Sequence, residues 1–120
     1  ICTDECIAHV DYKKAIVRAG ERSTMVTGLS MGHPVRCIRN PMIHEFEELE
    51  RRGASEQEIV EFGTGRLRKA AMEGDVTHGS LMAGQVAGLV REIVPAGEVV
   101  ARTVAQAEAL LSRLQSMVVQ

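Results

Sequence analysis

The chain has 120 residues, of which 45% are hydrophobic, 25% are charged and only 2% are aromatic, and its formal net charge is -2. This composition is ordinary for a globular domain with an aliphatic core, and it lacks the basic, aromatic surface with which proteins bind nucleic acids. No apolar run approaches about 20 residues, so we expect no membrane span; the three cysteines form no disulfide pattern, which favours a cytoplasmic protein.

The beginning of the chain predicts a short α-helix over residues 11–19, ended by Gly20. Asp4 and Glu5 are placed to cap its entry. The apolar face of this helix is formed by Tyr12, Ala15, Ile16 and Ala19.

The next segment differs from the helical remainder of the chain. Two β-prone runs, residues 24–27 and 35–38, are separated by a loop with turn residues, which predicts a small hairpin. His33 lies in this loop and Arg36 follows it closely, so the pair is a candidate general acid or anion-binding site. The alternative is an ordinary hydrogen-bonded loop histidine.

Helix signals are strong in the middle of the chain. Asn40 is a good N-cap, because the following Pro41 needs no hydrogen-bond acceptor for its nitrogen in the first turn. Ser55 and Glu58 have the spacing of a capping box. The predicted helices cover residues 41–52, 56–63 and 65–73, and the first of them buries Met42, Phe46 and Leu49.

The most unusual segment is residues 79–94, which predict a helix that Ser80 caps. Each glycine inside a helix costs about 1 kcal/mol relative to alanine, so a close approach must offset the cost. The partner is another backbone, as in tight helix–helix packing, a cofactor ring or a substrate. The strip of small residues consists of Ala83, Gly84, Ala87 and Gly88.

The last predicted helix, residues 98–118, carries one apolar stripe with alternating steps of four and three residues. Such a stripe needs a partner, and we expect homo-oligomers with this helix as the seam. The stripe is formed by Val100, Val104, Ala107, Leu111, Leu114 and Val118.

These elements predict a mainly α-helical chain with a small β-hairpin, an α+β segment without the strand–helix series of a complete barrel. A metal site was considered because cysteine and histidine lie at spacings possible for zinc. A second close ligand pair is missing, so we expect no metal and idle thiols. The residues concerned are Cys2, Cys6, His9 and Cys37.

Four blocks in one order resemble the enoyl-acyl-carrier-protein reductase II and nitronate monooxygenase family, over most of the chain to about Ile93. They are Glu5-Cys6-x-Ala8-His9-x-x-Tyr12-Lys13, then Thr27-Gly28-x3-Gly32-His33-Pro34-Val35-Arg36-x-Ile38-x-Asn40, then Gly63-x-Gly65-x-Leu67-Arg68-Lys69-Ala70, and finally Gly79-Ser80-x-Met82-Ala83-Gly84-Gln85-x-Ala87-Gly88-Leu89-Val90.

The resemblance implies that the chain is the C-terminal segment, residues 1–120, of a (β/α)8 barrel enzyme that binds FMN. The catalytic residues are then expected upstream, and the 120-residue chain alone is expected to be inactive. The favoured activity is NAD(P)H-dependent reduction of an enoyl thioester, small or linked to acyl carrier protein. The alternatives are a nitronate monooxygenase, which uses oxygen, and a non-catalytic helical dimerisation module.

The same resemblance places the fourth block beside the flavin and the substrate. The expected cofactor-binding residues are Ser80, Met82, Ala83, Gly84 and Gln85, and the expected substrate-binding residues are His33 and Arg36.

Overall fold

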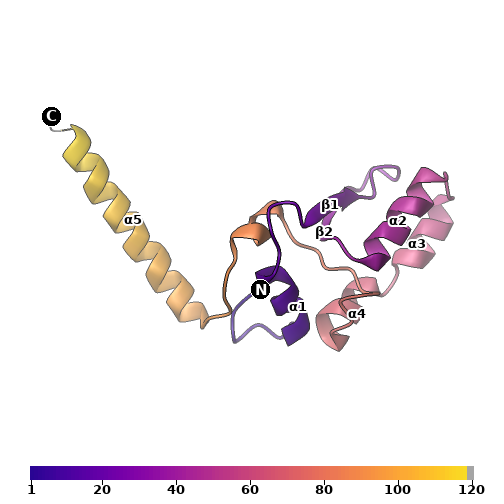
Figure 1. Cartoon of the computed structure of the whole chain (residues 1–120), viewed down its shortest axis with the longest axis horizontal. Coiled ribbons are helices and arrows are strands. Elements are labelled where there is room, and N and C mark those ends of the chain that lie inside the picture. Colours follow the sequence, from indigo (N-terminus) through magenta and orange to yellow (C-terminus); the bar gives the residue numbers. More distant parts are fainter. Residues whose placement is uncertain (119–120) are drawn as a thin grey trace.

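The computed structural model describes residues 1–118 as helices arranged around one β-hairpin, which confirms the predicted mainly α-helical class (Figure 1). The elements in chain order are α1 (Val10–Val17), β1 (Thr24–Thr27), β2 (Val35–Ile38), α2 (Pro41–Arg51), α3 (Glu56–Gly63), α4 (Arg66–Glu73), the 3-10 turn η1 (Gln85–Leu89) and α5 (Ala96–Val118).

The caps of the middle helices are confirmed. The Asn40 side chain accepts a hydrogen bond from the Ile43 backbone N–H at 2.9 Å, which satisfies one of the free donors at the start of α2. Ser55 and Glu58 form the expected reciprocal capping box at the start of α3. Local sequence therefore determines where these helices begin.

The expected cap of the first helix is wrong. His9 occupies the N-cap of α1, where its Nδ1 accepts from the Asp11 backbone N–H at 3.2 Å. Glu5 instead accepts from the backbone N–H of Ala96 at 2.9 and 3.1 Å, and so caps α5, 91 residues along the chain. Local capping patterns relate residues only a few positions apart, so they could not predict this contact.

The hairpin follows the predicted boundaries. β1 and β2 are antiparallel, with Thr24 opposite Ile38 and Thr27 opposite Val35. Gly28 has φ 78°, and an added Cβ there would lie 2.4 Å from the His33 carbonyl oxygen. Only glycine fits this left-handed, crowded position, and it lets the loop turn back toward β2.

The predicted helix over residues 79–94 is wrong. After a bend at Gly79, the chain runs beside β2, with Met82 opposite Cys37 in an antiparallel bridge. Ser80 therefore caps no helix. Two backbone hydrogen bonds join this segment to the hairpin, from Ile38 N–H to Leu81 O (2.9 Å) and from Ala83 N–H to Arg36 O (3.1 Å).

The rest of the predicted helix contains only a short 3-10 helix, η1, followed up to Pro95 by chain without further helix. The apolar residues of this stretch have helical spacing, but they also form a nearly continuous run with two glycines, which is equally compatible with a buried strand. Pairing with the free edge of β2 supplies hydrogen bonds that a glycine-rich helix would have to provide alone.

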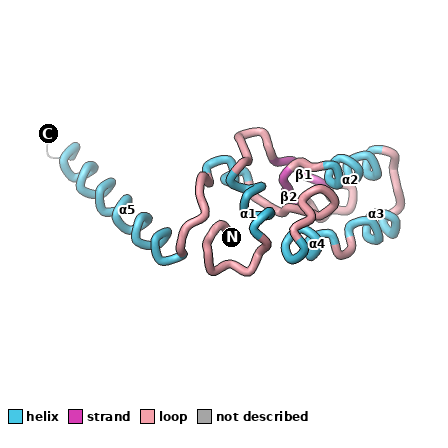
Figure 2. The backbone as a smooth tube through the Cα atoms, turned by 60° about the horizontal axis from the view of Figure 1, so that its bottom comes forward, coloured by secondary structure: helices cyan, strands magenta, loops and turns pink. Residues whose placement is uncertain are grey.

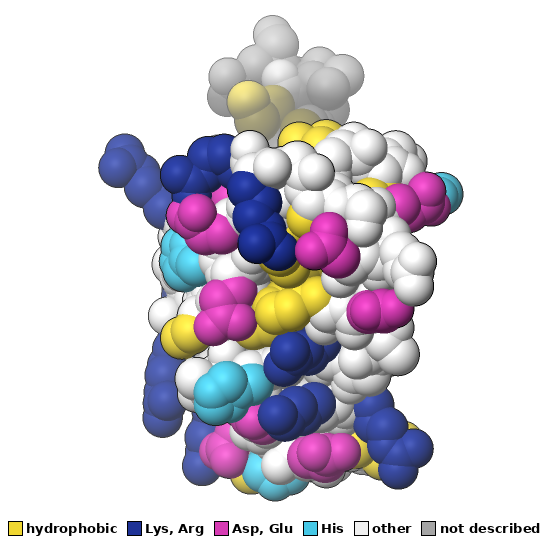
Figure 3. Space-filling model, turned by 90° about the vertical axis from the view of Figure 1, so that its right-hand side faces the viewer, with side chains coloured by type: hydrophobic (Ala, Val, Ile, Leu, Met, Phe, Trp, Pro, Cys, Tyr) yellow, Lys and Arg dark blue, Asp and Glu magenta, His cyan; other side chains and the backbone are white. Residues whose placement is uncertain are grey.

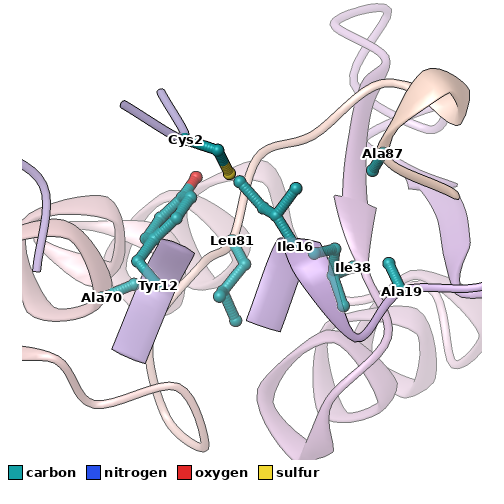
Figure 4. Close-up of a cluster of buried hydrophobic side chains, with 8 residues drawn as sticks. All are labelled: Cys2, Tyr12, Ile16, Ala19, Ile38, Ala70, Leu81 and Ala87. Carbon is teal, nitrogen blue, oxygen red and sulfur yellow. The ribbon is translucent and has the colours of Figure 1, made fainter. Parts of the chain in front are cut away.

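Two apolar clusters form the core. One joins α1 to residues near Leu81 and Ala70, and Figure 4 shows its side chains converging from α1, the hairpin and the segment around Leu81. The other lies between the hairpin, α2 and α3, with Cys37, Ile43 and Ile59 almost fully buried. Segment 79–83 adjoins both clusters, so its backbone is fixed on two sides.

The last helix, α5, projects away from the remaining elements in both backbone views (Figures 1 and 2). The radius of gyration is 18.5 Å, whereas a compact chain of this length would have about 14 Å. The described apolar residues of the predicted stripe are exposed, while the side chain of Val118 lies outside the described residues. Within residues 1–118, no helix is both long enough and apolar enough to cross a membrane.

Candidate functional site

A cavity of about 330 Å3 lies between the hairpin, α2, α3, the start of α4 and the segment around Met82. Its lining contains no aspartate, glutamate, lysine or arginine, so it suits an uncharged, apolar ligand. Its lining residues are Thr27, Gly28, Met31, His33, Val35, Cys37, Met42, Ile43, Phe46, Ile59, Val60, Gly63, Thr64, Leu67, Ser80 and Met82.

Two of the five expected cofactor-binding residues, Ser80 and Met82, form part of this wall. Ser80 is buried, and its hydroxyl lies 3.5 Å from the Cys37 sulfur. Burial raises the pKa of the Cys37 thiol, an effect that the hydrogen bond with Ser80 opposes only in part. The thiol therefore stays protonated and is no activated nucleophile.

The side chain of Asn40 fixes the entry to the same segment. Its Nδ2 donates to the carbonyl oxygens of Val76 and Gly79, each at 2.8 Å, while its Oδ1 caps α2. One amide thus joins the start of α2 to the residue immediately before Ser80. These three hydrogen bonds require two donors and one acceptor on the same short side chain, and the asparagine amide supplies all of them.

The loop that carries His33 is held by Glu50 of α2. The Glu50 carboxylate accepts from the backbone N–H groups of Gly28 (3.0 Å) and Ser30 (3.1 Å) and from the Ser30 hydroxyl (2.6 Å). Partial burial acts to raise the pKa of Glu50, but the hydrogen bonds outweigh it and the pKa lies below its usual range. His33 itself is exposed at the cavity wall.

Arg36 does not join His33 at the cavity. It lies on β2 between Val35 and Cys37, which both line the cavity, and alternation directs Arg36 to the opposite face of the strand. There its guanidinium donates to the Thr24 hydroxyl at 3.1 Å.

Ala83, Gly84 and Gln85 also lie outside the cavity lining, on the stretch that leads away from Met82. Gly84 and Gln85 are exposed, and an added Cβ on Gly84 would meet no atom within 4 Å. Together with Met82, which is 42% exposed, they form an open edge beside the cavity. The structure thus divides the expected cofactor-binding residues between a cavity wall and a surface edge.

The described residues hold no group of three histidine, cysteine, aspartate or glutamate side chains that could bind a metal ion. The three cysteines are free thiols, Cys2 and Cys37 being buried and Cys6 partly buried.

Charge is mixed on the end of the molecule that carries α2 and α3. Figure 3 shows acidic, basic and histidine side chains interspersed around a small apolar patch. Several of these charges are paired, for example Arg51 with Glu48 and Arg52 with Glu58. Such a surface generates no strong field of one sign and therefore does not point to a highly charged ligand.

Several residues of the site were not predicted as such. Met42 and Phe46 were expected only as core residues, yet they also line the cavity. Tyr12 was expected on the buried face of a helix, but its hydroxyl also donates to the Met82 carbonyl oxygen at 2.8 Å. The presence of Tyr12 in the first family-like block was the signal that could have singled it out.

A family model described as nitronate monooxygenase matches residues 1–106. The chain belongs to the nitronate monooxygenase family. Among curated proteins, a "probable nitronate monooxygenase" of Staphylococcus saprophyticus is 32% identical over 119 residues, which cover 94% of this chain and 32% of that protein. The family resemblance seen in the sequence is thereby confirmed.

Two solved structures of this enzyme family are also similar. FabK from Thermotoga maritima matches with a TM-score of 0.89 and 35% identity, over 96% of this chain and 36% of that chain. The M276A mutant of FabK from the same organism matches with a TM-score of 0.80 and 32% identity, over 96% of this chain and 34% of that chain. The chain spans about a third of the length of these relatives.

Proposed function

We propose that this chain is part of an FMN-dependent oxidoreductase that reduces enoyl thioesters with NAD(P)H. In that enzyme it forms the cavity that binds the substrate. The observation that carries the proposal is the uncharged cavity of about 330 Å3, whose wall includes Met82 and which adjoins the exposed edge at Gly84 and Gln85. The likeness to FabK, an enoyl-acyl-carrier-protein reductase, supports this choice of reaction.

The open edge fits one side of a flavin ring. Gly84 leaves free space where a side chain would stand, Met82 offers a polarizable thioether, and the Gln85 side chain is exposed to solvent. The cavity lining, in contrast, contains no lysine or arginine for a phosphate group. In the proposal, the edge formed by Met82, Ala83, Gly84 and Gln85 contacts the ring, and the phosphate is bound elsewhere in the full-length protein.

FMN, when bound, supplies the hydride that the substrate double bond accepts. The residues of this chain bind and orient the substrate. Apolar side chains such as Ile43, Phe46 and Val60 surround the acyl chain and exclude water from it. His33, at the exposed side of the cavity, is placed to hydrogen-bond the polar end of the thioester.

Nitronate monooxygenase is the second candidate, supported by the name of the matching family model and of the Staphylococcus saprophyticus relative. The two reactions differ in the electron acceptor and in substrate size. A small alkyl nitronate would leave most of the cavity unfilled, whereas the acyl chain of an enoyl thioester can occupy much more of it.

The test uses the full-length gene product. Its absorption spectrum should show a bound flavin, and under anaerobic conditions it should oxidise NADH or NADPH when an enoyl thioester is added. Nitronate-dependent oxygen uptake, with no thioester-dependent oxidation of nicotinamide, would select the second candidate. A full-length product that binds no flavin would refute both.

A further inference from the structure

The hairpin pairs with only one of the two edges of the backbone around Met82. The two hydrogen bonds between segment 79–83 and β2 involve Leu81 and Ala83, on either side of Met82. Met82 is therefore the non-hydrogen-bonded partner of Cys37, and its own carbonyl points away from β2. An exposed strand edge of this kind leaves polar backbone groups that need a partner.

The partner of that carbonyl is a side chain from a distant helix. The Tyr12 hydroxyl, from α1, donates to the Met82 carbonyl oxygen at 2.8 Å, across 70 residues of sequence. Tyr12 is 1% exposed and packs in the same cluster as Leu81 and Ile16 (Figure 4). Its ring is therefore fixed by packing, and the hydroxyl is a rigid donor rather than a mobile surface group.

The Tyr12 hydroxyl keeps its proton over the pH range in which most enzymes work. Burial, together with the nearby Cys37 thiol, raises the pKa of Tyr12 to about 12. The phenol thus remains a hydrogen-bond donor at neutral and moderately alkaline pH.

We propose that Tyr12 is a positioning residue: its hydroxyl holds the Met82 backbone in the register that places the Met82 side chain at the rim of the cavity. Tyr12 is not among the cavity-lining residues, so it acts through Met82 and not on the ligand. This inference rests on the proposed function, in which the cavity that Met82 lines binds the acyl substrate and the edge that includes Met82 lies beside the flavin ring.

The experiment uses the full-length flavoenzyme and steady-state kinetics with an enoyl thioester. Tyr12→Phe should raise KM for the thioester at least fivefold, with kcat and flavin content within twofold of wild type, because binding and not the chemical step depends on the rim. Met82→Ala should raise KM as well. In the Met82→Ala background, Tyr12→Phe should have no further effect on KM, since residues acting through one contact are not additive.

Two further variants separate positioning from general stability. Ile16→Val removes one methyl group from the same cluster without touching Met82, and should lower Tm while leaving KM unchanged. With 4-aminophenylalanine at position 12, which keeps a donor on the ring, KM should return to within twofold of wild type. If Tyr12→Phe does not fold, 4-fluorophenylalanine at position 12 fills the space of the hydroxyl without donating, and should give the same rise in KM.

The outcomes distinguish this inference from the proposed function. If Met82→Ala raises KM but the donor-free variants at position 12 only lower Tm, as Ile16→Val does, the positioning role of Tyr12 is wrong and the function of the cavity stands. If Met82→Ala leaves KM unchanged, the Met82 side chain does not bind the substrate and this inference is overturned, whereas the proposed function is still decided by the flavin spectrum and by thioester-dependent oxidation of nicotinamide.

Discussion

Gly84 and Gly88 are both small residues of one family-like block, yet their surroundings differ. An added Cβ on Gly84 would meet no atom within 4 Å, whereas on Gly88 it would lie 3.0 Å from the Gly20 carbonyl oxygen. Gly88 is therefore small because η1 lies close to the backbone of the turn that follows α1. Nothing within the described chain requires Gly84 to be small, which is consistent with a partner outside it, as the proposed flavin would be.

This contrast gives a paired prediction for the full-length protein. Gly84→Val should change the free energy of unfolding by less than about 0.5 kcal/mol, because it creates no contact in this chain. It should raise the dissociation constant of FMN, or KM of the thioester, about tenfold. Gly88→Val should do the reverse, destabilising by about 1–3 kcal/mol through overpacking. Chemical denaturation and flavin titration measure the two effects; equal loss of stability and binding in Gly84→Val would contradict the assignment.

At the scale of elements, the parts that the sequence predicted correctly are those with local signals. Asn40, the Ser55–Glu58 capping box and the two β-prone runs act within a few residues, so their helices and hairpin have the expected boundaries. Segment 79–83 was mistaken for a helix because its conformation is decided by the edge of β2, about 45 residues earlier in the chain. The cavity could not be predicted, since its walls come from elements that only the fold brings together.

The turn before this segment depends on Asp75. Its carboxylate accepts from the backbone N–H groups of His78 (2.8 Å) and Thr77 (3.1 Å), and the Lys69 ammonium lies 3.3 Å away. The backbone hydrogen bond from His78, joined by these other donors, holds the pKa of Asp75 well below its usual range. Because the folded pKa is the lower one, Asp75 stabilises the fold above the ordinary aspartate pKa of about 3.9, and this stabilisation is lost as the pH falls below that value.

Asp75→Asn should therefore lower stability at pH 7 and weaken the loss of stability between about pH 5 and pH 3. Thermal unfolding across this range measures both effects. Glu73→Gln, which removes an exposed acid from the neighbouring end of α4, is the matched control and should keep the wild-type pH dependence. An unchanged pH profile in Asp75→Asn would show that the turn does not depend on the charge.

On the scale of the whole molecule, the helix α5 packs its apolar stripe against no other element of residues 1–118. Its apolar residues stay exposed along most of its length, including Val100, Leu111 and Leu114, each more than half exposed. Most surface helices bury such a stripe. The stripe itself was predicted from the sequence.

We predict that the 120-residue chain, produced alone, associates through α5. Light scattering should give a mass of at least twice the 13.1 kDa of one chain. Replacing Leu111 and Leu114 together by glutamate should return the chain to monomers, because charges in an apolar seam are costly to bury. Gln115→Glu, a similar change outside the stripe, should leave the association intact. A wild-type chain that is monomeric at high concentration would contradict the prediction.

The central claim is that the uncharged cavity binds the acyl chain of the substrate, and Val60 offers the most direct test of it. Val60 lines the cavity yet is 51% exposed, so Val60→Phe fills the cavity at little cost to folding. Met72→Phe, at a residue 53% exposed on α4 and outside the cavity lining, is the control. In the full-length enzyme, Val60→Phe should raise KM at least tenfold for an eight-carbon enoyl thioester and less than twofold for a four-carbon one. Equal effects on both substrates, or no effect on either, would contradict the claim.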